Sequence, residues 1–189
     1  MTKTRIRSES ELARRGRDLK KVRDALDEAG VDYWLASGAL LGAYRDGDFI
    51  RWDWDVEIDV RQEDLEERLG DLHGALARRR FQVRMPRGNK WRVGCRRRNG
   101  TPIGIWGFAL QTDVDGTLHR RKLVSTFNVP LRFWETGAFV ELRGELYQAH
   151  APVADYLAWT YGPDWRTPVR SDKHSEYLSA GFRGDRFKE

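Results

Sequence analysis

The sequence of 189 residues has a single cysteine, Cys95, and no long apolar run. One cysteine excludes an intramolecular disulfide and a zinc site built from several thiolates. No apolar window is long enough to cross a bilayer, and no repeat or low-complexity segment divides the chain. We therefore expect one domain over residues 1–189, soluble and cytoplasmic, with at most a peripheral contact with a membrane surface.

Positive charge and aromatic rings, by contrast, are plentiful. The net charge is +5, and the chain holds eight Trp and eight Phe residues. A basic surface attracts phosphate-bearing partners such as nucleotides, nucleic acid or anionic lipid head groups, although an arginine-rich soluble protein without such a partner has the same charge. The rings supply core volume and can also line a concave binding site.

Apolar periodicity predicts an α+β fold, with a mixed β-sheet flanked by helices. Residues 8–29 place their leucines on one helical face, and Gly30 can end that helix. A short apolar strand over residues 31–36 and a short helix through residue 44 follow. The remaining elements are expected as strands over residues 49–60, 81–85, 91–97, 103–110 and within 132–147, and as helices over residues 62–80 and 152–161.

Four carboxylates recur at every second position of the strand predicted over residues 49–60: Asp53, Asp55, Glu57 and Asp59. On a strand, such residues project from one face, while the apolar residues between them form a core face. Neighbouring like charges repel, so the fold must place them in water near arginines or around a divalent cation. A cation there would stabilise charge on a transferring phosphoryl group.

Two further features could contact phosphate. Ser37-Gly38 is a small turn between a strand and a helix, where backbone N–H groups can approach a phosphate; a plain turn with Ser37 as the helix N-cap is the alternative. Lys90 and Arg92 alternate beside the acidic strand, and they either meet donor phosphates or form a solvated or salt-bridged face. A phosphate-binding turn followed by an acidic strand is typical of nucleotidyltransferase-fold enzymes.

The run SGALLGAYRDGDFIRWDWDVEIDV at residues 37–60 resembles the signature of the LicD/fukutin family. The run YGPDWRTP at residues 161–168 resembles the closing motif of that family, so the resemblance covers residues 30–175 or so. It implies a nucleotidyltransferase-like fold and a transferase that moves phosphocholine, or a related phosphoalcohol, from a CDP-activated donor to a sugar hydroxyl of a glycan or glycoconjugate.

The resemblance also implies roles for individual residues. Asp53, Asp55 and Glu57 fall on the acidic motif and are expected to be catalytic and to bind Mg²⁺ or Mn²⁺. Ser37 and Gly38 fall on the preceding turn. The motif's arginine is Arg45, for which we expect phosphate contact or structural pairing; Lys90 completes the expected phosphate-binding set.

The sequence departs from the family pattern at two places. Glu57 stands where the family usually has Asp, and a glutamate can still ligate a metal. In the later strand the family's Asp is replaced by Gly104. Either another residue supplies that carboxylate or the catalytic set is altered. The candidates for a replacement carboxylate are Asp113, Asp115 and Glu141.

Two alternative functions remain open from the sequence. A nucleotidyltransferase could use the same metal site to attach NMP to a small molecule or protein. A catalytically degenerate module could instead bind nucleic acid or an anionic surface through its basic face. We favour the phosphoalcohol transferase, with a CDP-activated donor and a sugar acceptor as partners and no role for nucleic acid.

Overall fold

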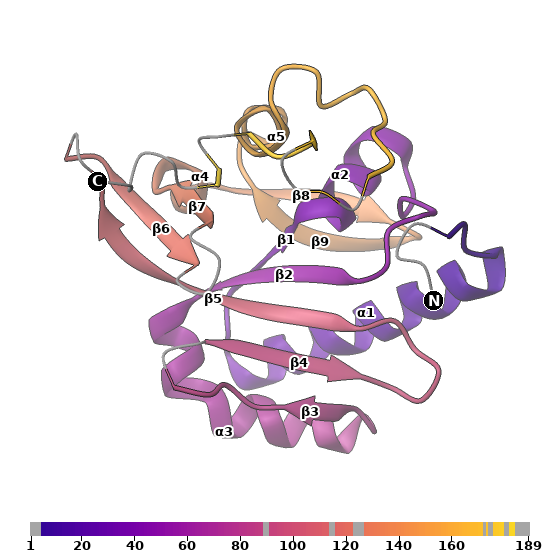
Figure 1. Ribbon diagram of the computed structural model, residues 1–189. Helices are drawn as coiled ribbons and strands as arrows, with labels where there is room; N and C mark the ends of the chain where they lie inside the picture. The colour runs from indigo at the N-terminus through magenta and orange to yellow at the C-terminus, as the bar shows by residue number, and fades with distance from the viewer. Residues whose placement is uncertain are drawn as a thin grey trace.

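The computed structural model of the chain describes residues 5–88, 91–113, 116–122, 127–171, 173, 176–179 and 182–183. In this part of the chain, nine strands form a mixed sheet with helices on both sides, which confirms the predicted α+β class (Figure 1). In chain order the elements are α1 (Glu9–Ala29), β1 (Tyr33–Ala36), α2 (Ser37–Asp46), β2 (Val56–Arg61), α3 (Gln62–Arg78), β3 (Gln82–Arg84), β4 (Arg92–Arg96), β5 (Ile103–Thr112), β6 (Leu118–Lys122), β7 (Phe127–Pro130), α4 (Arg132–Glu135), β8 (Gly137–Leu142), β9 (Glu145–His150) and α5 (Val153–Tyr161).

The sheet runs in the order β3-β4-β5-β2-β1-β9-β8. Strand β2 is central, because it pairs in parallel with β5 on one side and antiparallel with β1 on the other. The far half of β5 leaves the main sheet and pairs with β6, which pairs with β7 (Figure 1). The residues of β2 are therefore surrounded by sheet on both edges, which fixes where its side chains point.

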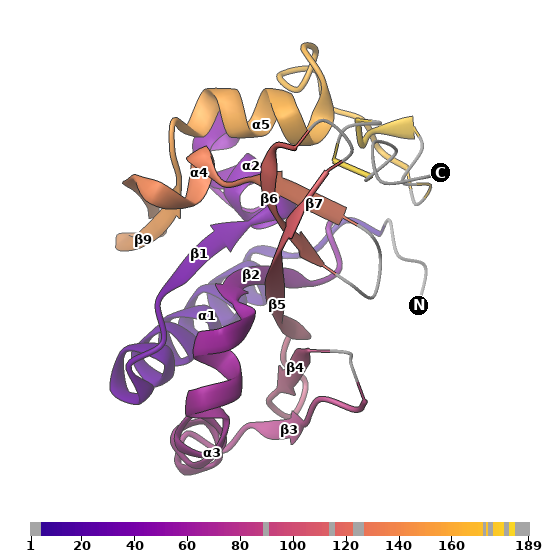
Figure 2. The ribbon, with the colours of Figure 1, turned by 90° about the vertical axis from the view of Figure 1, so that its left-hand side faces the viewer.

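The helices form two layers. Helices α1 and α3 lie side by side on one face of the sheet, and α2 and α5 lie on the opposite side (Figures 1 and 2). Helix α2 begins at the residue after β1, so its first turn is held at the end of a buried strand. This arrangement brings the start of α2 next to the start of β2.

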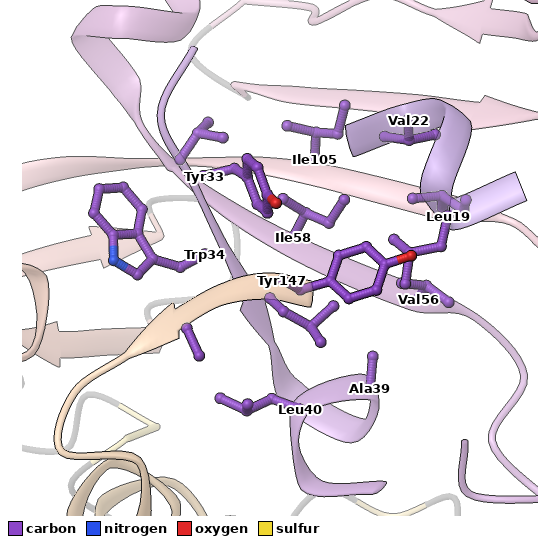
Figure 3. Close-up of a cluster of buried hydrophobic side chains, with 14 of the residues drawn as sticks. Leu19, Val22, Tyr33, Trp34, Ala39, Leu40, Val56, Ile58, Ile105 and Tyr147 are labelled. Carbon is purple, nitrogen blue, oxygen red and sulfur yellow. The ribbon is translucent and has the colours of Figure 1, made fainter. Parts of the chain in front are cut away.

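The core lies between α1 and the sheet and continues to α2 (Figure 3). Leu19 and Val22 of α1 are fully buried and pack near Val56 and Ile58 of β2, while Leu40 comes from α2. Alternate residues of β2 thus have different surroundings, as the predicted alternation requires. The residues at even positions, Val56, Ile58 and Val60, are buried in the core.

Helix α1 shows how well the local sequence specifies its ends. Ser8 and Glu11 form a capping box at its start, and Gly30 adopts a left-handed conformation with φ 68° at its end. The helix expected over residues 8–29 is therefore confirmed.

The expected strand over residues 49–60 is wrong in its first half. Residues before Val56 form a loop, tied by hydrogen bonds from Arg7 N to Arg51 O and from Asp53 N to Ile50 O. We call residues 47–55 the acidic loop. Its turn hydrogen bonds use backbone groups that a strand would pair with its neighbours. Consequently Asp53 and Asp55 do not alternate on a strand with Glu57.

Strands β6 and β7 were not expected. The sequence of β6, LHRRK, is too charged to show a strand period, and its strand conformation comes from pairing with β5. After β5, Gly116 N donates a hydrogen bond of 3.1 Å to Asp113 O. In the described residues, no helix is long and apolar enough to cross a membrane.

Cys95 belongs to the core. It is buried in β4, and burial raises the pKa of its thiol to about 12, which suits the expected structural role of this cysteine.

Replacing a core leucine of α1 tests this packing. Leu19→Ala should lower the free energy of unfolding by about 2–5 kcal/mol, because it leaves a cavity between α1 and β2. The exposed Arg17→Ala on the same helix is the control and should change stability by less than about 0.5 kcal/mol. Urea unfolding followed by circular dichroism measures both, and equal effects would contradict the assigned core.

Candidate active site

A cavity of about 790 Å³ opens where the start of α2, the acidic loop and the edges of β2, β4 and β5 meet. The segment after α5 closes its other side. Seven of the residues singled out from the sequence line this cavity: Ser37, Gly38, Arg45, Asp53, Asp55, Glu57 and Arg92. Lys90 lies outside the described residues.

Two glycines let the acidic loop lie directly on α2. Gly38 and Gly42 are four residues apart and so share one face of the helix. A Cβ atom on Gly38 would stand 2.1 Å from Asp53 Oδ2, and one on Gly42 would stand 2.5 Å from Asp48 O. We call this surface the glycine face of α2. Any side chain on it would push the loop, and Asp53 with it, away from the helix.

Two arginines that do not line the cavity bind the acidic loop. The buried Arg15 of α1 donates from Nη2 to the backbone oxygen of Asp53 at 2.8 Å, and its guanidinium lies 5.1 Å from the ring centre of Phe49. Arg143, in the turn between β8 and β9, makes two hydrogen bonds of 2.6 Å to Asp48. The loop is thus fixed through its backbone and through Asp48, while Asp53 and Asp55 line the cavity.

The carboxyl group of Asp53 has an unusual environment. Its pKa is raised to about 6, chiefly by burial; the positive charge of Arg15 opposes this shift and the negative charge of Glu57 adds to it. The backbone N–H of Trp54 donates to Asp53 Oδ1 at 2.8 Å. A carboxylate that is partly protonated near neutral pH, beside a second carboxylate, is well suited to take up a cation or a proton.

Glu57 is the acidic residue held on the sheet itself. In the register of the strands it lies between Ala36 of β1 and Gly104 of β5, neither of which carries a long side chain. Position 104, where the family resemblance implied an aspartate, is therefore next to Glu57. The space that a side chain at position 104 would use is occupied, because a Cβ there would stand 2.8 Å from Trp106 Nε1.

Two of the three replacement carboxylates suggested by the sequence, Asp113 and Glu141, do not line this cavity. Asp113 is buried and its Oδ2 lies 3.0 Å from His119 Nε2, whereas Glu141 is exposed and lines a different, smaller cavity beside β8. Asp115 lies outside the described residues. The structure instead brings Asp164 and Glu176 of the closing segment to the main cavity.

Asp59 does not belong to the cavity, contrary to its expected place in one acidic row. It is 3% exposed, and its Oδ2 lies 3.2 Å from Nε2 of His150. The His150 ring lies parallel to the ring of Trp34 and stacks on Tyr156, with centroids 4.4 Å apart in the latter pair. Asp59 is therefore part of a buried network, and we exclude it as the base that accepts a substrate proton.

Asp53, Asp55 and Glu57 do not form a preformed metal cage. Within the described ranges, no group of three or more His, Cys, Asp or Glu side chains is arranged to hold a metal ion. Mg²⁺ is usually held by one or two carboxylates together with water and substrate phosphates, so a complete protein cage is not required. The donor set of Asp53, Asp55 and Glu57 fits that kind of ion in its chemistry.

Helix α2 presents its N-terminus to the same cavity. Its N-cap is Ala36, not Ser37, and among the described residues no side chain caps it by a hydrogen bond. Ser37 is the first helical residue and has a positive φ of 49°. Arg45 lines the cavity while it pairs with Asp46 through two hydrogen bonds of 2.8 Å. The cavity thus combines a helix N-terminus with a guanidinium and several carboxylates.

The closing wall of the cavity was hardly evident in the sequence. Trp165 of the closing motif is buried against Tyr44, with ring centroids 5.9 Å apart, and it also lines the cavity. The motif YGPDWRTP was therefore the available signal. The other aromatic residues on the cavity wall come from separate parts of the chain, and they are Trp52, Trp54, Trp106, Phe127, Tyr161, Tyr177 and Phe182.

The mixed sheet and this cavity are those of a domain with the nucleotidyltransferase fold. Residues 30–135 match the family model described as LicD/FKTN/FKRP, nucleotidyltransferase domain, which is more than half of the chain. The chain therefore belongs to the LicD/FKTN/FKRP family, and the resemblance noted in the sequence is confirmed.

Two curated relatives are similar over most of the chain. The ribitol 5-phosphate transferases FKRP of Mus musculus and Homo sapiens are each 32% identical to it over 146 residues, which is 73% of this chain. The matched region is 29% of the length of those relatives. Among solved structures, the lincosamide antibiotic adenylyltransferase LnuA with bound lincomycin matches with a TM-score of 0.47 and 13% identity, covering 78% of this chain and 82% of LnuA.

The glycine face yields a first test of the site. Gly38→Ala should lower the free energy of unfolding by about 1–3 kcal/mol, because its methyl group displaces Asp53. The control is Gly70→Ala in α3, where a Cβ meets no atom within 4 Å; it should raise stability by about 0.5–1 kcal/mol through helix propensity. If thermal unfolding shows equal gains for both variants, the close contact of Asp53 with α2 is wrong.

The raised pKa of Asp53 yields a second test. Its carboxyl titrates near 3.8 when unfolded and near 6 when folded, so its contribution to stability is present at low pH and is lost as the pH rises through 6. The stability of Asp53→Asn relative to the wild type should therefore increase by about 1–3 kcal/mol between pH 4 and pH 7.5. Urea unfolding at the two pH values measures this, and a difference that decreases with pH contradicts the assignment.

Proposed function

We propose that the chain transfers a phosphoalcohol, with phosphoribitol as the first candidate, from a CDP-activated donor to a sugar hydroxyl of a glycan or glycoconjugate. The observation that carries this proposal is the single cavity in which Asp53, Asp55 and Glu57 meet the N-terminus of α2. The names of the two relatives, ribitol 5-phosphate transferases, support the choice of phosphoalcohol.

The donor diphosphate is proposed to lie between α2 and the acidic loop. The first N–H groups of α2 and the positive end of its dipole favour a phosphate, and Ser37 at the start of the helix lies at the cavity wall. Arg45 adds a guanidinium whose bidentate pair with Asp46 fixes its direction. These groups position the donor and offset its negative charge.

A divalent cation, Mg²⁺ or Mn²⁺, is the proposed cofactor, and Asp53, Asp55 and Glu57 are the residues that would hold it. When bound, such an ion neutralises charge on the donor diphosphate and on the departing nucleotide. The pKa of Asp53 is raised by burial first and by the charge of Glu57 as well, and a bound cation would offset both the burial of the charge and the repulsion.

The acceptor is proposed to enter along the aromatic wall. Rings such as Trp54 and Tyr177 line the cavity and offer flat apolar faces to a sugar. The hydroxyl that attacks phosphorus must lose a proton to a group within hydrogen-bonding reach. Glu57 is the proposed acceptor of that proton, since Asp59 is buried against His150 and Asp53 lies against Gly38.

Removing two of the three carboxylates tests the proposal. The variant Asp55→Asn, Glu57→Gln should lose transfer from CDP-ribitol by on the order of 100-fold or more, because the cation site and the proton acceptor are both removed. Chelation of divalent ions should abolish transfer by the wild type. Mass spectrometry of a sugar acceptor measures the product.

The matched control is Glu141→Gln, which removes an exposed carboxylate beside the smaller cavity and should leave transfer unchanged. A normally folded double variant with full metal-dependent transfer would refute the assignment. An acceptor that gains CMP instead of phosphoribitol would show the alternative nucleotidyl transfer.

A further inference from the structure

We infer that Arg92, held on the ring of Trp106, is a further phosphate-binding residue of the cavity, and that its ligand is the diphosphate of a nucleoside diphosphate. This inference rests on the proposed function, because it assigns one more group to the same donor. Arg92 is the first residue of β4, and Trp106 is its registered partner on β5. Both side chains line the main cavity.

The place of this pair is created by Gly104. In the register of the sheet, Gly104 of β5 lies between Glu57 of β2 and Gly94 of β4. Of these three neighbouring residues, only Glu57 has a side chain. A Cβ on Gly104 would stand 2.8 Å from Trp106 Nε1 and 3.5 Å from Arg92 Nε. The indole edge and the guanidinium therefore fill the space beside Glu57.

The ring of Trp106 orients the guanidinium. Arg92 Cζ lies 4.5 Å from the centroid of that ring, a distance at which the cation is attracted to the ring face. A stacked guanidinium loses less freedom when it binds a ligand, because its plane is already set. Arg92 is consequently ordered before a ligand arrives.

The guanidinium of Arg92 has unused hydrogen-bonding capacity. Its Nε is buried and makes no hydrogen bond within the described part of the chain, where Arg92 also forms no ion pair. A half-buried cation without an anionic partner is costly, and a phosphate satisfies it with two parallel N–H···O bonds. If Arg92 served only to neutralise Glu57, the two side chains would be expected to pair directly.

The cavity then has two walls of opposite charge. Asp53, Asp55 and Glu57 lie on one side, and Arg92 lies on the strand beyond Gly104. A diphosphate bound between them would receive hydrogen bonds from the guanidinium of Arg92, and the carboxylates would hold a cation that neutralises its remaining charge. Arg92 thus recognises the phosphate part of the donor and leaves the base and the alcohol to other groups.

Calorimetric titration of the full chain with CDP and Mg²⁺ tests this assignment. Arg92→Gln should weaken CDP binding by about 10- to 100-fold, as expected for loss of charge-assisted hydrogen bonds to phosphate. Binding of cytidine, which has no phosphate, should be the same in the variant and the wild type. Arg96→Gln is the control. Arg96 is exposed on the same strand and does not line the cavity, so its substitution removes the same charge away from the site.

The outcomes separate the two proposals. CDP binding of equal strength in the wild type and in Arg92→Gln, or equal weakening in Arg96→Gln, would overturn the role of Arg92 and leave the proposed function standing. Failure of the wild type to bind CDP with Mg²⁺ would overturn both. If Arg92→Gln unfolds, as judged by circular dichroism, Arg92→Lys decides: retained charge without the planar fork should weaken CDP several-fold, and unchanged affinity would refute bidentate binding.

Discussion

The candidate site depends on one close contact, that of the acidic loop with the glycine face of α2. Gly38 and Gly42 leave no side chain between the helix and the loop, so Asp53 and the backbone of Asp48 approach to distances that a Cβ atom would forbid. The contact places the carboxylate of Asp53 at the N-terminus of the helix. Because a helix N-terminus attracts anions, this geometry joins the acidic and the phosphate-binding parts of the cavity.

Some charged residues around this contact hold the loop in place, and others line the cavity. Arg15 and Arg143 hold the loop by hydrogen bonds to the backbone oxygen of Asp53 and to the side chain of Asp48. The pKa of Asp53 is nevertheless raised, chiefly by burial and also by the charge of Glu57, although Arg15 lowers it, so ionisation of this carboxyl carries a cost. Such a cost is common where a site must accept a cation, since binding then relieves it.

Much of the fold and part of the site followed from the sequence. Periodicity and caps located α1, because its signals are local. The prediction of a strand over residues 49–60 was wrong in its first half. The alternation of Asp53, Asp55 and Glu57 is typical of a strand, but contacts with Gly38, Gly42 and Arg15 set the conformation of the loop before Val56. Those contacts join residues distant in the sequence, and a period of two cannot reveal them. The closing wall was missed for the same reason.

The same long-range logic changes the meaning of Gly104. From the sequence alone, Gly104 marked a position at which the family resemblance implied a carboxylate that the chain lacks. In the sheet, the lack of a side chain at Gly104 leaves space for Trp106 to lie beside Glu57, with Arg92 on its ring. A side chain at position 104 would need the space that Trp106 and Arg92 occupy. The glycine therefore accounts both for the missing carboxylate and for the guanidinium beside Glu57. The site thus holds a positive group beside the position where the family resemblance implied a negative one, and a positive group favours anions such as the phosphates of the proposed donor.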